Sequence, residues 1–207
     1  MLVTLFDDEF LSTVESLVRK HHTIYPRLPP QGLFLEALVE QGFILSKWPR
    51  DQVVPTTPNS PQHDLLVGTT RLSVKSETGK VTRVDKISIT KLCTTEKGDW
   101  NAPALVAHTL AHVARYDKIL MLRAIWETDF FQYQLLDIPV SLLSQMTQAR
   151  YKKVGTRKGR RSLAGEVMDG KKRLFRVHFD GADGKCQIHD LLVNRCEMLR
   201  QWRQPIV

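Results

Sequence analysis

An acid, a hydroxyl and an amine lie close together in the segment His63-Asp64-Leu65-Leu66-Val67-Gly68-Thr69-Thr70-Arg71-Leu72-Ser73-Val74-Lys75. Ser73 and Lys75 are two residues apart, so both project from the same face of an extended strand. A hairpin of this length can place Asp64 beside them. Hydrolysis of a phosphodiester requires oxygen ligands for a hard divalent cation and a positive group near the attacking water. The segment therefore carries the residue types for metal-assisted phosphodiester chemistry.

The elements around these residues follow from the pattern of apolar positions. Residues 63–67 predict a short strand, 68–70 a turn and 71–76 a half-buried strand, and residues 86–93 alternate in the same way. Residues 102–115 predict a helix that has Pro103 in its first turn. The short apolar run 119–126 predicts a buried strand.

This arrangement resembles the PD-(D/E)xK nuclease superfamily, which includes most type II restriction endonucleases. The resemblance implies that Asp64 is the first Mg²⁺ ligand, that Val74 offers its backbone carbonyl to the metal, and that Lys75 assists the water. His63 precedes Asp64, where the family often has proline. Ser73 occupies the position of the second acid, as it does in a branch of restriction enzymes with a Ser-x-Lys form, so another carboxylate must complete the site.

Three glutamates are candidates for the missing carboxylate. Glu36 is the first candidate, because the family often supplies a glutamate from an upstream helix, and residues 33–41 predict a helix that ends at Gly42. Glu77, two residues beyond Lys75 on the same strand face, is the second, and Glu40 is the third.

The positive charge of the chain lies in its last third. Residues 149–207 hold 15 Lys and Arg against 6 Asp and Glu, and seven of the twelve residues from 150 to 161 are basic. Such a surplus favours a polyanion partner. We expect residues 150–161 to form a flexible loop that contacts DNA, and the polar loop at 93–101 to reach base edges, as the resemblance implies. The predicted DNA-binding residues are Lys97, Asn101, Lys152, Lys153, Arg157, Lys158, Arg160 and Arg161.

The predicted fold class is α/β, with a central mixed β-sheet flanked by helices, as in restriction endonucleases. One endonuclease domain is expected over residues 1–207, with a catalytic core at about 33–126 and a basic segment, hairpin and helix at about 150–207. The remaining elements are a helix over 7–20, irregular chain over 49–63, a helix over 142–149, a hairpin over 174–188 and a last helix over 190–203.

Composition indicates an ordinary globular protein, with 42% hydrophobic and 25% charged residues. The three cysteines have no zinc-finger spacing, the N-terminal residues are acidic, and no apolar run reaches the length of a membrane span. We therefore expect a cytoplasmic protein that does not enter a membrane.

The function predicted from these features is that of a Mg²⁺-dependent type II restriction endonuclease, acting as a homodimer on double-stranded DNA at a short specific sequence. Two alternatives remain open at this point: a non-catalytic DNA-binding regulator, and a repair, transposition or RNA-processing nuclease of the same superfamily. In a purely structural interpretation, Asp64 ends a strand, Ser73 packs against the sheet and Lys75 protects an edge.

Overall fold

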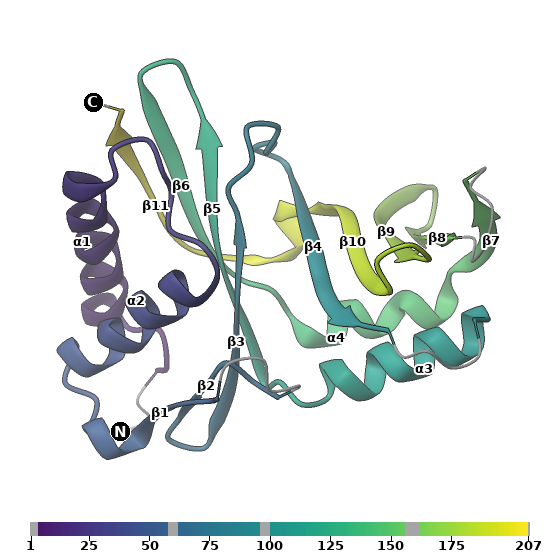
Figure 1. Ribbon diagram of the computed structural model, residues 1–207, viewed down its shortest axis with the longest axis horizontal. Coiled ribbons are helices and arrows are strands. Elements are labelled where there is room, and N and C mark those ends of the chain that lie inside the picture. The colour runs from purple at the N-terminus through teal and green to yellow at the C-terminus, as the bar shows by residue number, and fades with distance from the viewer. Residues whose placement is uncertain (1–3, 58–61, 96–99, 156–161, 207) are drawn as a thin grey trace. The chain divides into compact units, whose positions relative to one another are not determined.

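The computed structural model describes residues 4–57, 62–95, 100–155 and 162–206 (Figure 1). The chain divides into two compact units. Unit 1 comprises residues 1–82, 116–138 and 196–207, and unit 2 comprises residues 83–115 and 139–195. Each unit contains its own β-sheet.

Unit 1 combines two helices with a six-stranded sheet in the order β1-β2-β3-β5-β6-β11. Strands β3 and β5 are parallel, whereas the other neighbours are antiparallel, so the predicted mixed α/β sheet is confirmed. Its elements are α1 (Asp8–Ile24), α2 (Gly32–Leu45), the 3₁₀ turn η1 (Arg50–Gln52), β1 (Val53–Pro55), β2 (Leu65–Val67), β3 (Thr70–Glu77), β5 (Lys118–Trp126), β6 (Phe130–Asp137) and β11 (Glu197–Pro205).

Helix α1 begins where the acidic cluster predicted it, because the Asp7 side chain caps the helix by accepting a hydrogen bond from the Phe10 N–H at 2.8 Å. Its buried face packs against α2, and the rings of Phe10 and Phe43 stack with centroids 4.0 Å apart. Together with apolar side chains of the sheet, the two helices form one hydrophobic core.

The predicted end of α2 at Gly42 is wrong, because the helix continues to Leu45. A Cβ atom at Gly42 would lie 2.7 Å from Val14 Cγ2 and 3.2 Å from the Phe10 ring. The glycine therefore allows α1 and α2 to approach closely inside the helix and does not cap it.

Residues 49–63 were predicted to be a loop or an extended connection without regular structure, and the second part of this prediction is wrong, because the stretch contains η1 and the short strand β1. Strand β1 is the outermost strand of its sheet, and its Pro55 lies opposite Leu65. Proline is compatible with an edge strand, since the outer side needs no backbone donor.

The predicted last helix over residues 190–203 is wrong. Residues up to Leu192 belong to β10, a 3₁₀ turn η3 (Val193–Arg195) follows, and β11 then pairs antiparallel with β6. The Trp202 side chain is buried and stacks on Tyr133 of β6, with centroids 5.0 Å apart. This pairing between distant segments overrides the local helical spacing of apolar residues.

Unit 2 has a five-stranded antiparallel sheet in the order β4-β10-β9-β8-β7. Helix α3 packs on this sheet, where the Thr109 hydroxyl lies 3.6 Å from the Cys93 sulfur. Its elements are β4 (Lys86–Thr94), α3 (Ala102–Val113), α4 (Val140–Ser144), the 3₁₀ turn η2 (Gln145–Gln148), β7 (Arg150–Val154), β8 (Ser162–Asp169), β9 (Lys172–Asp180) and β10 (Lys185–Leu192), followed by η3.

Two predictions in unit 2 need correction. The helix expected over residues 142–149 is a short α-helix that ends at Ser144 and continues as a 3₁₀ turn. The first part of the segment expected to be a flexible loop, Arg150–Val154, is strand β7. Strands β6, β7 and β8 were not predicted from the sequence.

None of the helices that the structure describes is long and apolar enough to cross a membrane.

The stacking of Trp202 on Tyr133 predicts that β11 contributes strongly to stability. Trp202→Ala should lower the free energy of unfolding by about 3 kcal/mol, because it removes a large buried side chain. Met198→Ala in the same strand should change it by less than about 0.5 kcal/mol, since Met198 is exposed. Equilibrium urea denaturation measures both, and equal losses would contradict the assigned role of Trp202.

Candidate active site

Asp64 is held at the start of strand β2 by backbone hydrogen bonds on both sides. Its N–H donates to the Leu72 carbonyl at 2.9 Å, and its own carbonyl accepts from the Thr56 N–H at 3.0 Å. The first bond extends the pairing of β2 with β3, and the second extends the pairing of β2 with β1. As a result, the Asp64 side chain lies beside the residues that follow Leu72.

The carboxylate of Asp64 brings together the three groups that the sequence placed on the next strand. Its Oδ2 atom accepts from the Ser73 hydroxyl at 3.0 Å, from the Val74 N–H at 2.6 Å and from the Lys75 ammonium at 3.4 Å. Among the described residues, these contacts all use Oδ2, so Oδ1 remains available for another partner.

The carbonyl of Val74 points to the same side of β3 as the Asp64 carboxylate, because β2 ends before it could pair with this part of β3. The β2 ladder stops at the pair Leu65 and Leu72, so beyond it this side of β3 has no strand partner. The N–H and C=O of one strand residue point to the same side. The Val74 N–H therefore bonds the Asp64 carboxylate, and the Val74 carbonyl accepts from the Lys75 ammonium at 3.3 Å.

The Lys75 side chain is partly buried. Its side chain is 19% exposed and that of Asp64 is 22% exposed, and the ammonium lies 6.0 Å from the centre of the Tyr116 ring. Charges in such a position interact more strongly than they would in bulk water. The parallel neighbour β5 fixes the register of this strand, with Lys75 opposite Met121.

Glu36, on helix α2, lies within the electrostatic reach of this cluster. Burial raises the pKa of the Glu36 carboxyl above its usual value, the negative charge of Asp64 raises it further, and the positive charge of Lys75 opposes the rise. Two carboxylates that disfavour each other's charge form a site where a bound cation would be stabilised.

Glu77 has a different environment. Its carboxylate accepts from Arg123 Nε at 2.7 Å, and the Arg123 side chain is completely buried. Arg123 also donates to the Gln134 side chain at 2.5 Å. Arg123 was not singled out from the sequence, although a lone charge within the apolar strand 119–126 was a usable signal. Glu77 thus neutralises a buried guanidinium.

The predicted DNA-binding residues are only partly described. Asn101 is exposed and caps helix α3, where its side chain accepts from the Ala104 N–H at 3.0 Å. Lys152 and Lys153 are exposed neighbours on β7, so their side chains leave opposite faces of the sheet. Five further predicted residues lie outside the described residues: Lys97, Arg157, Lys158, Arg160 and Arg161.

The donor set around Asp64 suits a hard divalent cation. Two carboxylates and a backbone carbonyl are oxygen ligands, the type that Mg²⁺ prefers, and Mg²⁺ usually keeps several waters besides one or two carboxylates. The described part of the chain has no group of three His, Cys, Asp or Glu side chains that could hold a metal by themselves.

A mixed sheet that presents oxygen donors beside a lysine has the groups that a metal-dependent nuclease requires. Residues 3–204 match the family model SmaI, described as type II site-specific deoxyribonuclease, and the chain therefore belongs to this family. It is 27% identical over 206 residues to the type II restriction enzyme SmaI of Serratia marcescens, an alignment that covers 96% of this chain and 81% of that protein. No solved structure matches.

The predicted class of enzyme is thereby confirmed: the chain is a type II restriction endonuclease, and its substrate is DNA. Enzymes of this class are generally metal-dependent. Neither a non-catalytic regulator nor a nuclease of repair, transposition or RNA processing accounts for a match that spans nearly the whole chain.

The raised pKa of Glu36 gives a prediction for the metal-free protein. A carboxyl whose pKa is higher in the folded than in the unfolded state costs stability as pH rises through the interval between the two values. Glu36→Gln should therefore raise the melting temperature above that of the wild type at pH 8 in chelator, and the gain should vanish below about pH 4. Glu40→Gln, one turn along the same helix, controls for the loss of a carboxylate. A lower melting temperature for Glu36→Gln at pH 8 would argue against the assignment.

Proposed function

We propose that this endonuclease hydrolyses phosphodiester bonds of double-stranded DNA with Mg²⁺, at a site formed by Asp64, Val74, Lys75 and Glu36. The observation that carries the proposal is the convergence of the Ser73, Val74 and Lys75 donors on one oxygen of Asp64. The membership of the chain in a family of type II site-specific deoxyribonucleases supports it.

Three groups of the chain would hold the metal: the Asp64 carboxylate, the Val74 carbonyl and the Glu36 carboxylate. Mg²⁺ bound there would lower the pKa of a water ligand and offset charge on the phosphate. The Ser73 hydroxyl and the Val74 N–H keep the Asp64 carboxylate in place through Oδ2, so Oδ1 can face the ion.

Lys75 acts next to this donor set. Its ammonium lies 3.4 Å from Asp64 and 3.3 Å from the Val74 carbonyl, so it is within one hydrogen bond of two of the proposed ligands. From this position it orients the attacking water and stabilises negative charge that develops on the phosphate. Because the ammonium is largely shielded from solvent, this stabilisation is stronger than at an exposed lysine.

Glu36 is a better candidate than Glu77 for the second carboxylate. Glu77 already compensates the buried charge of Arg123, and moving it to a metal would leave that charge uncompensated. The negative charge of Glu36, in contrast, is disfavoured by burial and by Asp64, which raise its pKa, so a bound cation would stabilise it. We therefore assign Glu77 a structural role in the strand that carries Lys75, and Glu36 the role of metal ligand.

We further propose that the enzyme acts as a homodimer at a short specific sequence, with residues 1–207 working as one endonuclease in the cytoplasm. Duplex DNA has two strands, and a two-fold symmetric dimer presents one active site to each strand of a symmetric sequence. The match of the family model across both compact units supports the view that both belong to one functional enzyme.

Loss of the Lys75 ammonium should abolish cleavage and leave DNA binding intact. Lys75→Ala should cut plasmid DNA at least about a hundredfold more slowly than the wild type in Mg²⁺, because the water and the phosphate lose their positive neighbour. Discrete fragments from the wild type should appear with Mg²⁺ and not with chelator. Lys20→Ala, at an exposed position of α1, is the control. Undiminished Mg²⁺-dependent cutting by Lys75→Ala would refute the site.

The two glutamates should respond differently to substitution. Glu36→Gln should lose cleavage at Mg²⁺ concentrations that saturate the wild type and keep a folded, stable protein. Glu77→Gln should lower the free energy of unfolding by about 3 kcal/mol, because it weakens compensation of the buried Arg123. Mg²⁺ titrations of plasmid cleavage and urea denaturation measure the two effects. The reverse pattern, with Glu77→Gln stable but inactive, would make Glu77 the ligand.

A further inference from the structure

Unit 2 has a sheet face that the catalytic residues do not use. One face of the β7–β8–β9 strands carries buried apolar side chains, among them Leu163, Val167 and Phe179. On the opposite face, Arg150, Lys152 and Arg176 are exposed. The register places Arg150 and Arg176 on either side of Glu166 in one row across the three strands.

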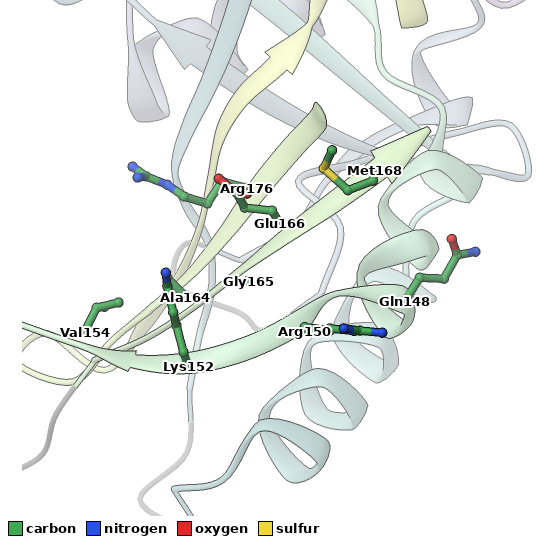
Figure 2. A pocket seen from close by; sticks show the side chains of 9 residues that line it. All are labelled: Gln148, Arg150, Lys152, Val154, Ala164, Gly165, Glu166, Met168 and Arg176. Carbon is green, nitrogen blue, oxygen red and sulfur yellow. The ribbon is translucent and has the colours of Figure 1, made fainter. Parts of the chain in front are cut away.

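This second face is hollowed. A depression of about 610 Å³ follows the strands, and six of its lining residues are Gln148, Arg150, Lys152, Ala164, Glu166 and Arg176. Figure 2 shows these side chains along β7, β8 and β9, with Gln148 on the turn η2 that precedes β7. Lys152 pairs with Ala164, whose small side chain leaves space on the strand next to the lysine.

The charge of this face is positive. Glu166 is its one acidic lining residue, and its carboxylate is bound by Arg173 at 2.6 Å. Within the described part of the chain, no ion pair joins Arg150, Lys152 or Arg176 to a carboxylate. Three unneutralised cations on an open, concave face are complementary to a polyanion.

Protection of a sheet edge does not account for this pattern. Strand β7 is the outermost strand, and charged side chains on an edge strand do discourage aggregation. Arg176, however, lies on β9, the middle strand of the five, where no edge needs protection. The cations therefore form a surface that crosses three strands.

We infer that this face, formed by Arg150, Lys152 and Arg176, binds the phosphate backbone of the DNA duplex. The inference rests on the proposed function, since it identifies how the substrate is held. The cations of this face span three adjacent strands. The major groove of B-DNA admits an α-helix or a two-stranded β-ribbon. The face must therefore lie across the phosphates, where it positions the duplex without reading bases.

Lys20 provides a control. It has the same charge as Lys152 and is also exposed, but it lies on α1 of unit 1 and is not among the predicted DNA-binding residues. Lys152→Ala/Arg176→Ala and Lys20→Ala can be compared by fluorescence anisotropy with a labelled 30-base-pair duplex of random sequence, in chelator, at several salt concentrations. Melting temperatures verify that each variant is folded.

Each phosphate contact contributes about 0.9 to the slope of log affinity against log salt, which corresponds to about eightfold in affinity at 0.1 M salt. The double variant should therefore lose about 1.8 of the slope and roughly sixtyfold in affinity at this salt concentration. Lys20→Ala should match the wild type, and the wild type should cut plasmid DNA in Mg²⁺.

The outcomes separate this inference from the proposed function. A double variant that binds like the wild type, or a Lys20→Ala variant that loses as much slope per removed cation as the double variant, overturns the assignment of this face while the proposed function stands. A wild-type protein that binds duplex but does not cut it in Mg²⁺ contradicts the proposed function and leaves the face supported by the salt slopes.

Discussion

The candidate site depends on one carboxylate oxygen that accepts three hydrogen bonds. Asp64 Oδ2 receives the Ser73 hydroxyl, the Val74 N–H and the Lys75 ammonium, which come from three consecutive residues of one strand. This is possible because β2 ends its pairing with β3 at Leu72 and leaves the following backbone groups of β3 to a side chain. Buried backbone donors need a partner, and here the partner is the acid itself.

The strand that carries these donors is anchored from the other side. It runs parallel to β5 over Leu72–Glu77, and at its end Glu77 pairs with Arg123, a residue of β5 with no exposed side-chain surface. A guanidinium in that position is costly unless an acid compensates it. Gln134, on the next strand, adds a second acceptor. A polar network thus links β3, β5 and β6 two residues beyond Lys75.

The two compact units differ in the charge that they present. In unit 1, acids and a lysine converge on a small oxygen-rich site, whereas in unit 2 three cations line a concave sheet face with one acid that already has a partner. The first arrangement suits a single hard cation and a reacting phosphate, and the second suits a row of phosphates. The basic surplus seen along the sequence thus includes a defined surface of β7–β9.

Local patterns in the sequence were sufficient to place the candidate residues and the strands that carry them. The spacing of Asp64, Ser73 and Lys75 predicted a hairpin that brings them together. Alternation predicted β3 and β4, and a short apolar run predicted β5, because such patterns are properties of neighbouring residues. Tertiary structure decided the rest. Gly42 lies within a helix because α1 approaches it, and residues 197–205 form a strand because β6 offers a partner and a stacking ring for Trp202. The choice between Glu36 and Glu77 likewise depends on Arg123, which is 46 residues from Glu77 in the sequence. Contacts between distant segments leave no periodic signal in either segment alone, and the ion pair of Glu77 with Arg123 is such a contact.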